Sequence, residues 1–158
     1  MSETIDNAKQ VIEAAKNRLL TTFAHVPDDR LHWTPSPTAK SAQRIAAHAA
    51  IANFGFAAMT RGERLPADNL ADVVRLSEAK ELAVTSREQA VAIIEESTRH
   101  LLSAIDALTP ERLRGDAYLP IGPMPMASFI FLGARHAEMH AGQIDYLQTI
   151  WGDLEFRI

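Results

Sequence analysis

The amino-acid sequence predicts an all-α protein, a four-helix bundle with a long crossover between the second and third helices. Two observations lead to this fold class. Four segments carry apolar residues at the three- and four-residue spacing that lets a helix bury one side. No segment is convincing as part of a sheet, and the most extended one, residues 118–126, contains three prolines, which exclude it from a central strand. Four such helices are expected to pack around one hydrophobic core.

The first helix is predicted from Thr4 to Phe23, with a charged side opposite an apolar side. The apolar side is formed by Ile5, Ala8, Ile12, Ala15, Leu19 and Phe23. Pro27 cannot continue the interior of a helix and therefore ends this one. The chain then passes through an extended segment, in which Trp33 is expected to cover one end of the core.

The second helix is predicted to begin between Ser36 and Ala42 and to end at Arg61. Gly62 suits the left-handed position that follows the end of a helix. The inward side of this helix is formed by Ile45, His48, Ala52, Phe56 and Met59. His48 is therefore expected to point into the protein, and the small alanines around it allow another helix to approach closely.

In the segment 63–85 the apolar residues follow no clear helical or strand period. A connection of this length is uncommon inside a compact domain. We interpret it as a crossover that runs along the bundle. A turn or two of helix is expected within it, between Leu70 and Leu76.

The third helix is predicted to begin at a capping box and to run to Leu108. Two pairs of residues have the spacing of this motif, Thr85 with Glu88 and Ser86 with Gln89. The inward side of the helix is formed by Val91, Ile94, Thr98, Leu101, Leu102, Ile105 and Leu108.

The fourth helix is predicted to begin between Pro125 and Ser128, after a packed extended loop over 118–126, and to end near Gly152. Two of its residues are histidines four positions apart, so both imidazoles lie on one side of the helix. The predicted inward side is formed by Phe129, Leu132, His136, His140, Gln143, Leu147 and Ile150.

Three histidines, His48, His136 and His140, are thus predicted to point into the bundle from two helices. Taken alone, His136 and His140 are most simply a pair of core histidines bonded to carbonyls and water. The third histidine favours a divalent metal site, because a metal satisfies one nitrogen of each ring, and a buried unpaired nitrogen costs about 1–3 kcal/mol. Three neutral ligands leave the ion its charge and a free coordination position, as a Lewis acid requires.

Two polar residues that follow His136 and His140 in the fourth helix are candidates for a role in supporting the metal ligands. Gln143 lies one turn after His140 and can hold a water molecule or the outer nitrogen of a ring, although a polar contact at the end of the bundle explains it equally well. Tyr146 is explained by packing with its hydroxyl at the surface. No inward carboxylate is predicted, so no catalytic residue is assigned. The histidines expected to be exposed are His25, His32 and His100.

Three features occur together in the chain. They are Trp33-Thr34-Pro35 before the second helix, His48 within that helix, and His136 and His140 followed by Gly142-Gln143-Ile144-Asp145-Tyr146 in the fourth. This combination resembles the DinB-like (DinB/YfiT) superfamily of four-helix bundles, over essentially the full length of the chain. We therefore expect residues 1–158 to form a single DinB-like domain.

The resemblance implies a zinc or nickel ion held by His48, His136 and His140, and frequently a homodimer. The superfamily includes transferases that use low-molecular-weight thiols and a thiol-dependent isomerase. Our first hypothesis is a metal-dependent enzyme, either a transferase that uses an external thiol or a hydrolase. The second hypothesis is a non-catalytic dimer that binds metal or a small ligand in a stress response.

The composition excludes several other kinds of chemistry. The chain has no cysteine, which rules out thiolate ligands and a cysteine nucleophile, so any reacting sulfur must come from another molecule. The N-terminus lacks a basic segment followed by an apolar run, and no stretch approaches the ~20 apolar residues of a membrane span, which predicts a cytoplasmic protein. A net charge of -4 without a basic run argues against nucleic acid as the main partner.

Overall fold

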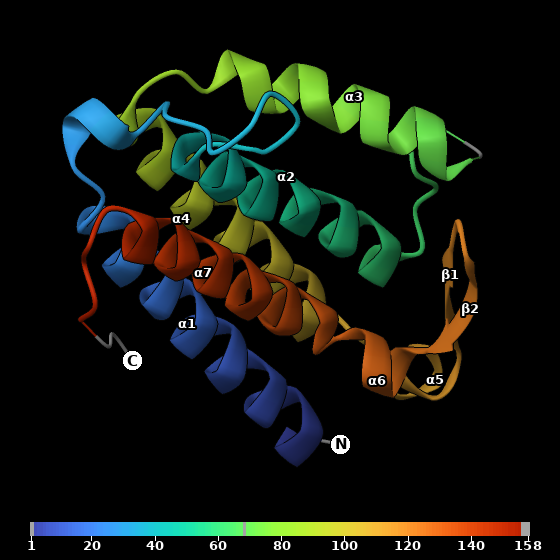
Figure 1. Cartoon of the computed structure of the whole chain (residues 1–158). Coiled ribbons are helices and arrows are strands. Elements are labelled where there is room, and N and C mark those ends of the chain that lie inside the picture. Colours follow the sequence, from blue (N-terminus) through green and yellow to red (C-terminus); the bar gives the residue numbers. More distant parts are fainter. Residues whose placement is uncertain (1, 68, 156–158) are drawn as a thin grey trace.

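The computed structural model describes residues 2–67 and 69–155 and shows four long helices packed around one core (Figure 1). These helices are α1 (Ser2–Ala24), α2 (Ala42–Arg61), α4 (Arg87–Asp106) and α7 (Leu132–Ile150). Each packs against two others, in the cyclic order α1, α4, α2, α7. The predicted all-α bundle is confirmed. In the described ranges, none of the helices combines the length and the hydropathy of a membrane-spanning segment.

Shorter elements connect the long helices. They are the 3-10 helix η1 (Asp28–Arg30), helices α3 (Leu70–Ala83), α5 (Pro110–Arg114) and α6 (Met126–Phe129), and strands β1 (Asp116–Leu119) and β2 (Gly122–Pro125). The core itself follows the predicted pattern most closely in α1, where the apolar side from Ala8 to Phe23 is buried. Trp33 is partly buried against the core and meets Trp151 edge-on, with 5.6 Å between ring centroids.

Capping residues set the ends of α2 and α4 close to where the sequence predicts them. The side chain of Ser41 accepts a hydrogen bond from the Arg44 backbone N–H at the start of α2, and Gly62 follows its end with a φ of 82°. Ser86 forms a capping box with Gln89 at the start of α4. Of the two capping boxes that the sequence allows, this second one is formed.

The crossover between α2 and α4 contains more helix than the sequence predicts. The weak periodicity predicts one or two turns, whereas α3 has 14 residues. The side chain of Asn69 starts this helix by accepting a hydrogen bond from the Asp72 backbone N–H. α3 packs against α2, on the outside of the bundle (Figure 1). The crossover is therefore a helical layer over α2.

The proline-rich stretch that was expected to be an extended loop forms a β-hairpin. Strands β1 and β2 pair antiparallel at one end of the bundle, with Asp116 opposite Pro125 and Leu119 opposite Gly122 (Figure 1). Each strand has only one neighbour, so a proline without an N–H can occupy a position on its free edge. The predicted fourth helix is also interrupted, since α6 ends at Phe129 and α7 begins at Leu132.

The inward sides predicted for two helices need correction. On α7, Gln143 and Ile150 are exposed, with 47% of Ile150 accessible, and on α4 Val91 is exposed. The buried side of α7 is instead formed by Gly133, Ala134, Ala137, His140, Ala141, Ile144, Leu147 and Gln148. Of the two histidines of α7, His140 is buried and His136 is half-buried.

Two glycines of α7 differ in the space around them, which gives a test of core packing. A Cβ atom added at Gly133 would lie 2.5 Å from Leu101 Cδ2 and 3.2 Å from Asn53 Oδ1, and both of these side chains are buried. Gly133→Ala is therefore expected to lower the free energy of unfolding by about 1–3 kcal/mol. Gly142 has no neighbour within 4 Å, so Gly142→Ala should raise it by up to about 1 kcal/mol through helix propensity. Urea denaturation measures both, and equal stability of the two variants would contradict this description of the core.

Candidate metal centre

The structure brings together the three histidines that the sequence predicts to point inward. His48 comes from α2, and His136 and His140 come from the adjacent helix α7. One nitrogen from each ring can be chosen so that all three lie within 4.8 Å of one another. The Nε2 atoms of His136 and His140 are 3.1 Å apart, and the ring centroid of His48 lies 5.2 Å from that of His136 and 4.8 Å from that of His140.

The spacing of these nitrogens fits a shared ion. Two nitrogens bound to one metal at about 2.0–2.1 Å lie roughly 3 Å apart for ordinary bond angles, which agrees with the 3.1 Å between His136 Nε2 and His140 Nε2. His140 Nδ1 lies 2.8 Å from Gln143 Oε1, an oxygen that can only accept a hydrogen bond. The proton of His140 is therefore on Nδ1, and its Nε2 lone pair faces the cluster.

His136 is held differently from the other two rings. Its Nδ1 is buried and has no hydrogen-bond partner among the described residues. Instead, the ring packs edge-on against Phe56, with 5.6 Å between centroids and 83° between planes. The orientation of this imidazole is thus set by packing.

A buried carboxylate that the sequence did not reveal supports His48. Glu81, near the end of α3, has a side chain that is 0% exposed, and its Oε1 lies 2.6 Å from His48 Nδ1. The other carboxylate oxygen lies 2.6 Å from Lys40 Nζ and 3.3 Å from Arg44 Nη2. Because an ionised carboxylate only accepts, Nδ1 of His48 carries the proton and donates it to Glu81. The Nε2 atom of His48 is then free to act as a ligand.

Burial and charge set the protonation states that a metal would require. Burial by itself would raise the pKa of Glu81, but hydrogen bonds from His48 and Lys40 outweigh it and lower the pKa to about 2. Burial lowers the pKa of His136 to about 3, helped by the neighbouring histidines. Burial also lowers the pKa of His140, against the opposing effect of its bond to Gln143. Near neutral pH, Glu81 is therefore a carboxylate, and His136 and His140 are neutral, as metal ligands must be.

A cavity of about 580 Å³ opens beside the cluster, within the size range of small-molecule sites. Its apolar wall includes Ile45, Met139 and Leu147, and its polar lining is formed by Lys40, His48, His140, Gln143 and Tyr146. Tyr146 is 67% exposed, as its predicted surface position requires. The cavity thus joins two of the three histidines to both residues that the sequence singled out for a supporting role.

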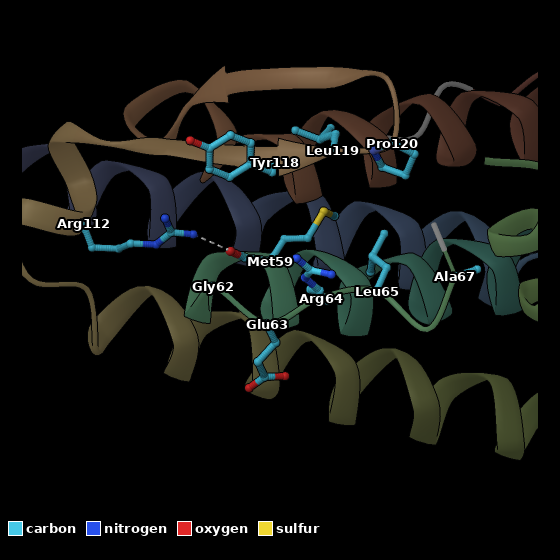
Figure 2. A pocket seen from close by; sticks show the side chains of 10 residues that line it. All are labelled: Met59, Gly62, Glu63, Arg64, Leu65, Ala67, Arg112, Tyr118, Leu119 and Pro120. Atoms are coloured by element: carbon cyan, nitrogen blue, oxygen red, sulfur yellow. Dashed lines mark hydrogen bonds between the residues drawn. The ribbon is translucent and has the colours of Figure 1, made fainter. Parts of the chain in front are cut away.

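A second cavity, of about 520 Å³, lies between the end of α2 and the β-hairpin (Figure 2). Arg112 borders it, but this guanidinium already donates to the backbone carbonyls of Met59, Thr60 and Asp116. In Figure 2, the Glu63 carboxylate points away from the hairpin side chains. Arg61, which does not line the cavity, pairs with this carboxylate at 2.5 Å. Among the described residues that line this cavity there is no histidine, so it is separate from the candidate metal centre.

The remaining histidines lie where the sequence places them. His25, His32 and His100 are exposed, and none belongs to the cluster. Glu81, by contrast, was missed, because α3 has no apolar stripe from which its inward side can be read. The available signal was the unusual length of the crossover, which is typical of functional segments, but it does not distinguish Glu81 from Glu78 one turn earlier.

Comparison with solved structures shows what the fold is similar to. A mycothiol-dependent maleylpyruvate isomerase matches with a TM-score of 0.74 and 12% identity, over 89% of this chain and 60% of that protein. A DinB-like protein from Bacillus subtilis matches with a TM-score of 0.67 and 15% identity, over 96% of both chains. A conserved protein from Enterococcus faecalis matches with a TM-score of 0.68 and 16% identity, over 92% of this chain and 95% of that one.

These identities show a shared fold, and the chain spans only about 60% of the isomerase. A comparison with the sequences of curated proteins gives no significant match. The family model of the DinB superfamily matches residues 12–144, a range that contains all three clustered histidines and the supporting Glu81 and Gln143. The chain belongs to the DinB superfamily.

Proposed function

We propose that His48, His136 and His140 bind one divalent metal ion, zinc or nickel, and that the loaded protein is an enzyme that uses an external low-molecular-weight thiol. One observation carries this proposal. Three imidazoles from two helices converge within 4.8 Å, two of them at the wall of a cavity of about 580 Å³. A site that only held the fold together would have no need of a cavity beside its ligands.

When bound to three neutral ligands, a divalent ion would supply a Lewis acid with a coordination position open to substrate. The residues of the chain prepare this position. Glu81 and Gln143 hold His48 and His140 with Nε2 toward the cluster, and Phe56 fixes the ring of His136 by packing. The ammonium of Lys40 adds positive charge at the cavity wall, which favours an anionic substrate or the thiolate form of a thiol.

If the reaction uses a thiol, the composition requires that thiol to come from another molecule. The chain has no cysteine, so a sulfur nucleophile must be a bound cosubstrate. A transferase and an isomerase both fit this chemistry, and the likeness of the fold to a mycothiol-dependent isomerase is compatible with it. A hydrolase is the other reaction type that an open Lewis-acid position supports.

One observation favours the alternative, a non-catalytic bundle that binds metal or a small ligand. No carboxylate lines the cavity among the described residues, and Glu81 lies behind His48, on the Nδ1 side of the ring. Apart from the proposed ligands, the described lining offers the side chains of Lys40, Gln143 and Tyr146 for proton transfer or hydrogen bonding. The homodimer and the cytoplasmic location expected from the sequence stay predictions.

Metal content is the direct test of the proposal. Protein made without a His-tag should contain about one zinc or nickel per chain by elemental analysis. Adding Zn²⁺ to the metal-free protein at 100 times its Kd should stabilise the fold by about 2.7 kcal/mol. For a chain of this size, such stabilisation raises Tm by roughly 5–10 °C. Differential scanning calorimetry measures the shift.

The control for this test is a variant with both His136→Ala and His140→Ala, which should contain no metal and show no shift with Zn²⁺. A wild-type protein that stays metal-free and whose Tm responds to neither Zn²⁺ nor Ni²⁺ would refute the metal site. A Co²⁺-loaded protein then separates the two functions. A thiol that enters the site changes the visible spectrum of the cobalt, whereas a spectrum insensitive to every small thiol tested favours the non-catalytic alternative.

A further inference from the structure

The crossover helix α3 is attached to the bundle in an unusual way. Its only buried residue is Glu81, and no side chain of α3 belongs to the hydrophobic core or to the apolar residues packed around it. Two of its larger apolar side chains, Leu70 and Leu82, are 50% and 61% exposed. Val73 and Leu76 are half-buried, but neither belongs to the core, so hydrophobic packing holds α3 less firmly than it holds the long helices and polar contacts add to it.

Those polar contacts converge on one group. The carboxylate of Glu81 meets three side chains of the second helix and the segment before it, at 2.6 Å from His48 Nδ1, 2.6 Å from Lys40 Nζ and 3.3 Å from Arg44 Nη2. Glu78, one turn earlier, reaches only Arg44, at 3.7 Å, and its side chain is 49% exposed. Glu81 is thus both the main polar anchor of α3 and the direct partner of a proposed metal ligand.

We propose that Glu81 is a positioning residue of the metal centre and couples it to the crossover, so that metal binding and docking of α3 onto α2 stabilise each other. This inference rests on the metal site proposed above. A cation on Nε2 withdraws electrons from the imidazole and makes Nδ1–H a better donor, which strengthens the bond to Glu81. Conversely, the carboxylate fixes the tautomer and the orientation of His48 and raises its basicity as a ligand. By reciprocity, each event favours the other by the same factor.

Charge adds to this coupling. Without Glu81, the cations Lys40 and Arg44 would stand next to the proposed ion with no buried anion between them. Their repulsion would lower the affinity for a divalent metal. When α3 undocks, it removes this carboxylate, so an open crossover and a weak metal site should occur together.

Hydrogen exchange measured by mass spectrometry on α3 tests the proposal in the whole protein. In metal-free protein, Glu81→Leu should make α3 peptides exchange several-fold faster than in wild type, while α4 peptides stay unchanged. Saturating Zn²⁺ should slow α3 exchange in wild type but not in Glu81→Leu. The Kd for Zn²⁺, from competition with a chelator, should rise about 10- to 100-fold in Glu81→Leu. For Glu81→Gln, both the α3 exchange rate and the Kd for Zn²⁺ should lie between those of wild type and Glu81→Leu. The glutamine amide oxygen still accepts a hydrogen bond from His48 but carries no charge.

Glu78→Gln is the matched control and should leave both exchange and Kd unchanged. Equal α3 exchange in metal-free wild type and Glu81→Leu would refute the anchor. An unchanged Kd in Glu81→Leu would refute the positioning role. Zn²⁺ that binds wild type without slowing α3 exchange would refute the coupling. If wild type binds no Zn²⁺ at all, the metal site and its coupling both fail, and the metal-free comparison still decides whether Glu81 anchors α3.

Discussion

Replacing any one of the three clustered histidines with alanine is expected to lower the affinity for Zn²⁺ by well over 100-fold. Loss of a hydrogen bond that merely supports a ligand typically costs 10- to 100-fold, and loss of the ligand itself should cost more. The alanine also leaves an ion with two protein ligands instead of three. Competition with a chelator of known affinity at pH 7.5 measures the Kd for His48→Ala, His136→Ala and His140→Ala.

The chain offers three matched controls, since His25, His32 and His100 are exposed and lie outside the cluster. Alanine at any of these positions should change the Kd by less than a factor of two or three. If alanine at one of the clustered histidines changed the Kd equally little, that histidine would not be a ligand of the metal. The result would then separate a two-histidine site from the three-histidine site proposed here.

The helices could be predicted because local chemistry fixes them. Gly62 and the Ser86–Gln89 pair satisfy the backbone groups at helix ends, and these signals act over a few residues. The apolar stripe of α1 is also local information, because a 3.6-residue period reports which side is buried. The ends of α2 and α4 and the buried side of α1 can therefore be predicted from nearby residues alone.

The convergence of the three histidines was predicted from helix periodicity, which gives only the approximate direction of a side chain. The inward side drawn for α7 included Gln143 and Ile150, both of which are exposed. His140 is buried and lines the cavity, whereas His136 is half-buried and packs against Phe56. The periodicity of α2 and α7 gave the approximate direction of the rings, and only the packing of the two helices shows that they meet.

The part that could not be predicted depends on contacts between distant segments. Glu81 and His48 are 33 residues apart and belong to different helices. Nothing in the sequence around Glu81 distinguishes it from an exposed glutamate of the same helix. Glu81 is buried because the side chains of Lys40, Arg44 and His48 surround its carboxylate. The β-hairpin likewise depends on the pairing of β1 with β2, which prolines allow because neither strand is central.

Acidifying the metal-free protein from pH 7.5 to 5.0 is expected to lower the unfolding free energy of wild type by about 2 kcal/mol more than that of His136→Gln. Burial lowers the pKa of His136 from 6.5 to about 3 in the folded protein. Between these values the unfolded chain binds the extra proton, so the contribution of His136 is fully present above pH 6.5 and is lost as the pH falls toward about 3. The slope is about 1.4 kcal/mol per pH unit.

The comparison with His136→Gln isolates this group, because His140, whose pKa is also lowered by burial, is present in both proteins. Glu81 has a pKa lowered from 4.5 to about 2, so its own contribution is lost only below pH 4.5. His100→Gln, which changes a half-exposed ring, should lose as much stability as wild type over the same range. Urea denaturation of EDTA-treated protein at half-unit steps of pH gives the three curves. Parallel curves for wild type and His136→Gln would mean that His136 takes up its proton in the folded protein, and the neutral, metal-ready state of that ring would have to be abandoned.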